Sequence, residues 1–283
     1  MKMRLKSAAN SIRQKEGRVS EINTLLKYPG SKWRIADWII SHFPEHKVYC
    51  EPFFGSGAVF FNKSPVYIET INDLDRNIVN LFRVCREYPE KLAQLIEMTP
   101  FAREEFNDCY EKSDDPIEQA RRTIVRYHQS FGTSNSSRNS WRNVQTYGGP
   151  RCATMWNYLP DSIAKCVERL KQAQIENIDA VELIRRYNDK NTLIYCDPPY
   201  LPSLRRKAMY AREMNEQQHM ELLKALTTSK SMVIISGYDS ELYNRELEGW
   251  CTDIKETTAQ MGFHRVEKIW ANFEFDMQMK LWA

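Results

Sequence analysis

The chain has 283 residues, 42% hydrophobic and 27% charged, which is ordinary for a globular protein and suits one large domain or one domain with an insert. No apolar run is long enough to cross a bilayer, and the net charge of only +3 does not by itself indicate a nucleic-acid partner. The seven cysteines are odd in number and form no Cys-x-x-Cys pair, which argues against a disulfide framework or a zinc site and favours reduced thiols in the cytosol.

The predicted elements begin after a basic N-terminal stretch that lacks the apolar segment of a secretory signal, and we interpret residues 1–23 as a tail. Strands are expected at 47–50, 65–73, 174–179, 192–197 and 231–237, with a late strand pair at 252–259 and 266–273. Helices are expected at 32–42, 75–88, 161–172 and 215–228. Strands that alternate with helices indicate an α/β sheet with crossover connections.

Residues 85–171 interrupt this alternation with helix-like segments and a stretch rich in Gly, Ser, Asn and Arg. We interpret 85–171 as an inserted recognition domain, and 24–84 together with 172–283 as one catalytic domain. The stretches 121–151 and 203–212 are basic, free of acids and interleaved with aromatic residues, a composition that suits phosphate contact and base stacking. A solvated loop surface is the alternative, but two such stretches in one chain favour nucleic acid.

A glycine turn follows the first predicted strand in the sequence CEPFFGSGAVFF. Gly55 and Gly57 allow backbone shapes closed to other residues and let a ligand approach closely. The next strand ends at Asp73, where an acid can accept hydrogen bonds from ribose hydroxyls. A helix cap is the alternative for Asp73, but Asp75 is better placed for that role and leaves Asp73 for a ligand. The third glycine of the dinucleotide pattern is absent, so the turn fits an adenosine ligand without a buried pyrophosphate.

A second unusual turn follows the apolar run in NTLIYCDPPY, which ends at Tyr200. Pro198 and Pro199 cannot continue the strand, because proline lacks the donor that a sheet requires and fixes φ. Asp197 therefore lies at the carboxyl end of a buried strand, where open α/β sheets bind ligands. A strand stop with a capping acid is the plain alternative.

These motifs together resemble the alpha group of Dam-type N6-adenine DNA methyltransferases. The order of the motifs matches that family: KYPGSKWRI at 27–35, EPFFGSG at 51–57, IND at 71–73 and DPPY at 197–200. The resemblance covers the chain from about residue 24 and places a target-recognition region before DPPY. It implies a Rossmann-like S-adenosylmethionine-dependent methyltransferase sheet with an inserted, mainly helical target-recognition domain. The implied reaction methylates the exocyclic N6 amine of a flipped-out adenine in duplex DNA, leaves S-adenosylhomocysteine and needs no metal.

The resemblance also implies roles for individual residues. The residues expected to contact the cofactor are Tyr28, Lys32, Glu51, Phe53, Gly55, Gly57, Asp73, Asp179 and Asp197. The residues expected to take part in catalysis are Lys32, Asp197, Pro198, Pro199 and Tyr200. The Asp197 carboxylate and the rigidly held Pro198 carbonyl would accept the hydrogens of the poorly nucleophilic adenine amine. Tyr200 would stack on the extruded base, and proximity to the cofactor would supply much of the rate.

The partner implied by the resemblance is double-stranded DNA in the cytoplasm of a bacterial or phage-infected cell, at the nucleoid, and a cognate restriction endonuclease is left open. Candidates for contact with base edges or phosphates are Arg138, Asn139, Arg142 and Asn143, and candidates for contact with phosphates are Arg205, Arg206 and Lys207. The competing acceptors are the cytosine N4 amine and adenine in RNA, although an Asp at position 197 favours adenine over cytosine. A catalytically silent DNA-binding protein of the same fold is the alternative from another class.

Overall fold

The computed structural model describes residues 24–132, 134, 137–145, 147, 151–205, 208–258 and 264–275. The predicted tail at 1–23 lies outside the described residues, as do Arg206 and Lys207. Within the described part of the chain, no helix is long and apolar enough to span a membrane.

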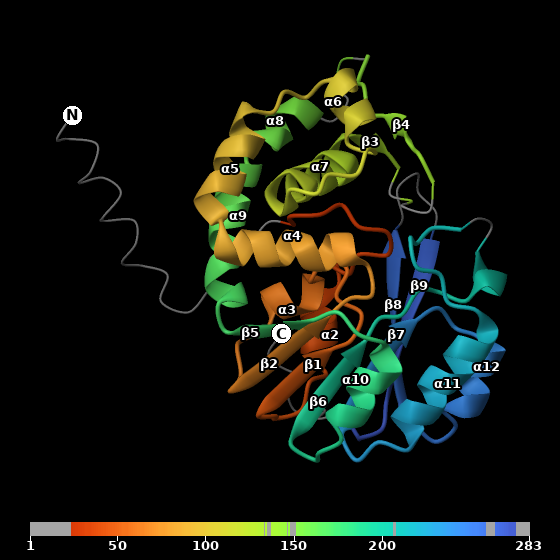
Figure 1. The fold of residues 1–283 in the computed structure, drawn as a ribbon. Coiled ribbons are helices and arrows are strands. Elements are labelled where there is room, and N and C mark those ends of the chain that lie inside the picture. Colours follow the sequence, from red (N-terminus) through yellow and green to blue (C-terminus); the bar gives the residue numbers. More distant parts are fainter. Residues whose placement is uncertain are drawn as a thin grey trace.

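A seven-stranded sheet forms the centre of the part of the chain that is described (Figure 1), in the order β5-β2-β1-β6-β7-β9-β8. The strands are β1 (Val48–Glu51), β2 (Ile68–Asn72), β5 (Ala173–Glu176), β6 (Thr192–Cys196), β7 (Met232–Gly237), β8 (Cys251–Thr258) and β9 (His264–Ala271). The five neighbouring strands β5, β2, β1, β6 and β7 are parallel, whereas β9 runs antiparallel to both β7 and β8. The predicted α/β sheet with a late strand pair is therefore confirmed.

Helices cover both faces of the sheet. They are α2 (Ala36–Ile40), α3 (Ala58–Asn62), α4 (Arg76–Glu87), α5 (Pro89–Met98), α6 (Arg103–Asp108), α7 (Pro116–Gln129), α8 (Cys152–Trp156), α9 (Leu159–Leu170), α10 (Ala180–Arg186), α11 (Glu216–Thr227) and α12 (Glu241–Glu246). In Figure 1, α10, α11 and α12 lie on one face, and α2, α3 and α4 lie on the other. Three of the four predicted helices are present within two residues of their expected ends, but the one expected at 32–42 covers only 36–40.

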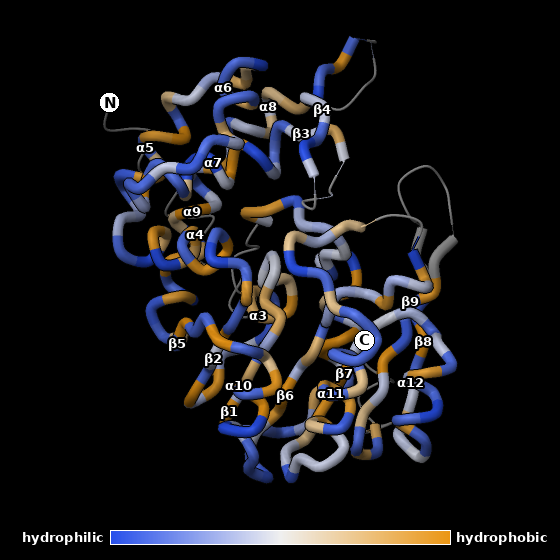
Figure 2. Tube along the Cα trace, turned by 45° about the vertical axis from the view of Figure 1, so that its right-hand side comes forward, coloured by the Kyte–Doolittle hydropathy of each residue, from blue (hydrophilic) through white to orange (hydrophobic). Residues whose placement is uncertain are grey.

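The central strands show why the sheet is buried on both sides. Along β6, Leu193 and Tyr195 pack into the core that α2, α3 and α4 cover, whereas Ile194 and Cys196 pack against α10, α11 and α12. This alternation follows from the two-residue period of a strand, and both sets are apolar because both faces are covered. Figure 2 shows the hydrophobic residues gathered along these central strands, with hydrophilic residues at the outer loops.

The predicted insert is mainly helical. Helices α5 to α8 and the short hairpin of β3 (Ser130–Phe131) and β4 (Ser140–Trp141) lie beyond one edge of the sheet in Figure 1. Its apolar side chains join the same core as α2, α3 and α4, so packing is continuous between the insert and the sheet. The assignment of 85–171 to target recognition stays a prediction.

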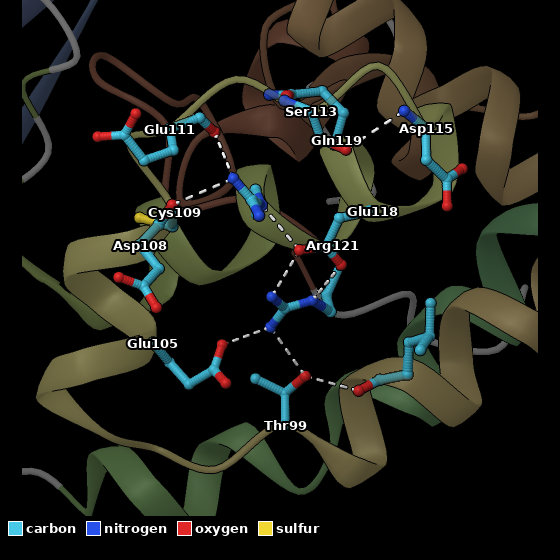
Figure 3. A network of polar contacts seen from close by, with 12 residues as sticks. Thr99, Glu105, Asp108, Cys109, Glu111, Ser113, Asp115, Glu118, Gln119 and Arg121 are labelled. Carbon is cyan, nitrogen blue, oxygen red and sulfur yellow. Dashed lines mark hydrogen bonds and ion pairs between the residues drawn. The ribbon is translucent and has the colours of Figure 1, made fainter.

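Two of the basic residues in the stretch 121–151 serve the fold of this region (Figure 3). Arg121 donates hydrogen bonds to Glu105 of α6, to Glu118 one turn earlier on α7, and to the Thr99 hydroxyl at the end of α5. Arg122 donates to Glu118 and to the carbonyl of Glu111. These two arginines are therefore structural, and the basic character of the stretch overstates the charge that it offers to DNA.

Candidate active site

A pocket lies at the edge of the sheet where the parallel strands β1, β2 and β6 end. Its empty space, including the part open to solvent, is about 1160 Å³. Among the predicted site residues, those that line it are Tyr28, Lys32, Glu51, Phe53, Gly55, Asp73, Asp179, Asp197 and Pro199. The carboxyl ends of parallel strands meet at one edge, which brings together residues that are up to about 170 positions apart in the chain.

The glycine turn lies at one end of this pocket, and both of its glycines have a left-handed backbone conformation. Gly55 has φ +51°, and a Cβ there would lie 3.0 Å from the Tyr28 ring. Gly57 has φ +67°, and a Cβ there would meet the rings of Phe54 and Phe61 at 2.5 and 2.7 Å. L side chains rarely adopt this backbone region, so both positions require glycine. Gly57 was expected to contact the cofactor, but it does not line the pocket and instead allows the turn to pack on the two phenylalanines.

Asp73 connects the end of β2 to the glycine turn. Its Oδ2 accepts a hydrogen bond from the Gly55 amide at 2.8 Å, and its Oδ1 accepts one from the Asp75 amide at 2.8 Å. The expectation that Asp73 stands free for a ligand is thus wrong in part, because its carboxylate already holds the turn. Burial raises the pKa of Asp73 to about 7, although the backbone hydrogen bonds oppose this rise. Asp75 caps α4 as predicted, since its Oδ1 accepts from the Asn77 amide at 2.9 Å.

Two further acids face the pocket in different surroundings. Glu51 is buried at the end of β1, where burial raises its pKa to about 8 and the Tyr49 hydroxyl donates to Oε2 at 2.7 Å. Asp179 is exposed and caps α10, accepting hydrogen bonds from the amides of Val181 and Glu182 at 2.9 and 3.2 Å. The cap uses one oxygen of Asp179, and the rim position leaves it beside any ligand in the pocket.

Lys32, Asp197 and Tyr200 form a polar cluster next to this pocket. The Lys32 Nζ lies 2.8 Å from Asp197 Oδ1, and it donates to the Tyr200 hydroxyl and to the Gly30 carbonyl, each at 2.8 Å. Burial alone would lower the pKa of Lys32, but the carboxylates of Asp197 and Glu267 outweigh it and raise that pKa well above the usual value. Lys32 is therefore a buried ammonium held against the carboxylate of the DPPY turn.

Several residues of the cluster were missed by the sequence analysis. Ser236, at the end of β7, donates to Asp197 Oδ1 at 2.9 Å, and Tyr238 stacks on Tyr200 with ring centroids 4.1 Å apart. Glu267 of β9 accepts a hydrogen bond from the Tyr200 hydroxyl at 2.9 Å. Ser236 and Tyr238 had a detectable signal, since they lie at and just after the end of a buried strand and so must lie at the same sheet edge as Asp197. An acid within an antiparallel strand such as β9 carries no comparable signal.

The residues expected to contact DNA lie in two places. Arg138 is exposed beside the β3–β4 hairpin, lies over the Tyr110 ring and donates to Asn107 Oδ1 at 3.0 Å. Asn143 is exposed, and Arg142 and Asn139 are half-buried, with their side chains bonded to the carbonyls of residues 130 and 134 respectively. The remaining described residue of this group, Arg205, lies in the loop after DPPY.

Arg205 has a partner other than the expected phosphate. Its guanidinium donates to both carboxylate oxygens of Glu213, at 2.8 and 2.5 Å, and its side chain is only 5% exposed. Glu213 also accepts from the amides of Met209 and Tyr210, at 2.7 and 2.9 Å. Arg205 thus organises the loop that carries Tyr210 over the pocket, and this bidentate pairing leaves it unsuited to phosphate in this arrangement.

A glycine turn, acids at the ends of parallel strands and an adjacent Lys–Asp–Tyr cluster define an α/β enzyme that binds a nucleoside-type cofactor beside a reaction centre. The chain belongs to the D12 class N6 adenine-specific DNA methyltransferase family, whose family model matches residues 28–263. Its reaction is methylation of adenine in DNA, and membership implies S-adenosylmethionine as the methyl donor.

The relatives found by sequence have consistent names. The chain is 28% identical over 244 residues to a DNA adenine methylase of Haemophilus influenzae, covering 77% of this chain and 82% of the relative. It is 27% identical over 236 residues to a DNA adenine methylase of Escherichia coli K12, covering 77% and 81%. Among solved structures, a putative methylase of Haemophilus influenzae aligns over 91% of this chain and 100% of that one with 13% identity and a TM-score of 0.38. The fold assignment rests on the order and direction of the strands in the sheet.

Proposed function

We propose that this protein transfers the methyl group of S-adenosylmethionine to the N6 amine of an adenine turned out of a DNA duplex at a specific sequence. The observation that carries the proposal is the position of Asp197 and Tyr200 at a sheet edge shared with the glycine turn. A base bound at that turn would lie within reach of the cofactor pocket, which supports the proposal. A type II methyltransferase of Lactococcus lactis, 27% identical over 196 residues, supports a search for a cognate restriction endonuclease.

The pocket fits such a cofactor in its donor and acceptor groups. The buried Glu51 and the half-buried Asp73 have carboxyls that suit hydroxyl and amine donors, and Asp179 at the rim suits the amine of a purine. Phe53 and Gly55 offer an apolar wall and a close backbone approach. When bound, S-adenosylmethionine supplies a methyl group on a sulfonium that carries its own leaving group. Among the described residues, no group of three or more His, Cys, Asp or Glu side chains is placed to hold a metal ion.

Asp197 activates the amine in this proposal. Its carboxylate accepts a hydrogen bond from N6 and is placed to take up the proton that the amine loses, while the Pro198 carbonyl accepts the second hydrogen. The Lys32 ammonium now lies against Asp197 Oδ1. The adenine amine must therefore displace this ammonium or share the carboxylate with it. The turn thus works as a preorganised pair of acceptors whose direction the two prolines fix.

The target base needs room that the present arrangement does not offer. Tyr200 is 4% exposed, and its ring is stacked against Tyr238 with centroids 4.1 Å apart. A base between the two rings would need a separation of roughly 7 Å, twice the usual contact distance. The base therefore reaches the face of Tyr200 only when Tyr238 or the loop that carries Tyr210 moves.

The experiment that tests the proposal is mass spectrometry of nucleosides from unmethylated duplex DNA incubated with the protein and S-adenosylmethionine. We expect N6-methyladenine, formed also in the presence of EDTA because the proposed chemistry needs no metal. Formation of N4-methylcytosine, or methylation of RNA alone, would show that the methyl acceptor is not adenine in DNA. Binding of cofactor and DNA without any methylated base would identify a silent binder instead. Sequencing of the modified product then gives the recognition site.

The salt dependence of DNA binding distinguishes the two arginines discussed above. Arg138→Gln is expected to reduce the slope of log K against log salt concentration by about 0.9, the value for one neutralised phosphate. Arg205→Gln is expected to leave the slope unchanged, because that guanidinium is bonded to Glu213. Fluorescence anisotropy between about 50 and 200 mM salt measures both slopes. A lower slope for Arg205→Gln would return Arg205 to the phosphate role, and an altered sequence preference in Arg138→Gln would indicate base contact.

A further inference from the structure

Glu267 is a buried acid that reaches the reaction centre from β9. Its Oε1 accepts from the Tyr200 hydroxyl at 2.9 Å, and its Oε2 lies 3.9 Å from the Lys32 ammonium. The side chain is directed inward by the alternation of the strand, since the next residue, Lys268, pairs with Asp239 on the other face and lies over Trp270. Strand β9 runs antiparallel beside β7, which brings Glu267 to the sheet edge where β6 and β7 end.

Lys32 consequently lies between two carboxylates. Asp197 Oδ1 is at 2.8 Å and Glu267 Oε2 is at 3.9 Å, and the Tyr200 hydroxyl bridges Lys32 to Glu267. In the proposed function the adenine amine uses the same Asp197 carboxylate, whose negative charge Lys32 now neutralises. If Asp197 were the sole counter-ion, moving the buried ammonium away from it would be costly, because an unpaired buried charge is strongly destabilising. A second carboxylate next to the same ammonium reduces that cost.

We propose that Glu267 is a positioning residue of methyl transfer, and this inference rests on the proposed role of Asp197. Glu267 supplies the counter-ion toward which Lys32 turns when the adenine amine takes Asp197. It also fixes the Tyr200 hydroxyl, so that the ring keeps its orientation while the ammonium shifts. No covalent step is assigned to Glu267.

The variant Glu267→Gln tests this role, because the amide keeps the size and an acceptor for Tyr200 but removes the charge. We expect kcat to fall roughly tenfold, within the range seen for directly coupled neighbours, with the cofactor Kd within about twofold of the parent. Glu267→Asp, which restores the charge, is expected to recover most of the rate. Glu256→Gln on the neighbouring strand β8 is the matched control, because Glu256 is exposed and lies outside the pocket lining.

Access of the base to the site gives a readout that a merely structural role would not move. A duplex with 2-aminopurine at the methylated position should show a smaller fluorescence increase with Glu267→Gln than with the parent. In a Lys32→Met background, Glu267→Gln should leave that fluorescence unchanged, since no ammonium remains to be relocated. Parent-like kcat in Glu267→Gln, or an equal fluorescence loss with and without Lys32, would overturn the inference. If the parent itself methylates no adenine, the proposed function fails and not this inference alone.

Discussion

Replacement of Asp197 by asparagine is expected to lower kcat for adenine methylation by about 10³-fold, with the cofactor Kd within a few-fold of the parent. The amide oxygen can still accept hydrogen bonds from Lys32 and Ser236, which now hold Asp197 Oδ1 at 2.8 and 2.9 Å. The amide can neither take up the proton that the adenine amine loses nor offer a second acceptor. The loss therefore falls on the chemical step, and single-turnover methyl incorporation measures it directly.

Asp239→Asn is the matched control for this variant. Asp239 lies two residues after the end of β7, near the sheet edge that carries Asp197, but its side chain is 63% exposed and pairs with Lys268. Parent-like activity and unchanged thermal unfolding are expected for Asp239→Asn, because its ion pair is solvent-exposed. If Asp197→Asn kept more than about a tenth of the parent kcat, Asp197 would not be the acceptor on which the proposed mechanism depends.

The elements of this fold were predictable where local pattern decides them. The apolar run at 192–196 gives a strand buried on both faces, and Asp75 gives the start of α4, because both depend on neighbouring residues only. The helix expected from residue 32 starts later, since Gly30 with φ +70° and a turn from Tyr28 to Ser31 precede it. That turn places Lys32 against Asp197, a contact 165 positions away that no local pattern reveals.

The site was predictable only as far as its motifs, because the partners of the motif residues are distant in sequence. The Gly55 amide bonds to Asp73 18 residues later, so the acid thought free is part of the turn. Glu267 bonds to Tyr200 from 67 residues away, on a strand whose neighbours in the sheet are fixed only by the fold. The basic stretch 203–212 that contains Arg205 ends one residue before Glu213, the acid that pairs with it. Charge composition describes a segment, whereas pairing depends on its folded shape.

Asp73→Asn is expected to weaken cofactor binding by about 10- to 100-fold, the loss of one hydrogen bond to a charged acceptor. The single remaining oxygen must serve the Gly55 and Asp75 amides, so little acceptor capacity is left for a ribose hydroxyl. At saturating cofactor the kcat should stay within about threefold of the parent, because the proposed base site does not include Asp73. Isothermal titration calorimetry gives the Kd, and Asp161→Asn, an exposed acid on α9, is the control.

The pH dependence of cofactor binding separates the charge of Asp73 from its shape. Burial raises the pKa of Asp73 to about 7, so the ligand-free protein carries a carboxylate above pH 7 and a neutral carboxyl below it. Ribose hydroxyls donate to the ionised form, so the affinity is present above pH 7 and is lost as the pH falls through 7, by about tenfold at pH 6. Asp73→Asn should remove this dependence and leave only that of Glu51, whose pKa burial raises to about 8. Identical pH profiles for the parent and Asp73→Asn would mean that the Asp73 carboxylate does not bind the cofactor.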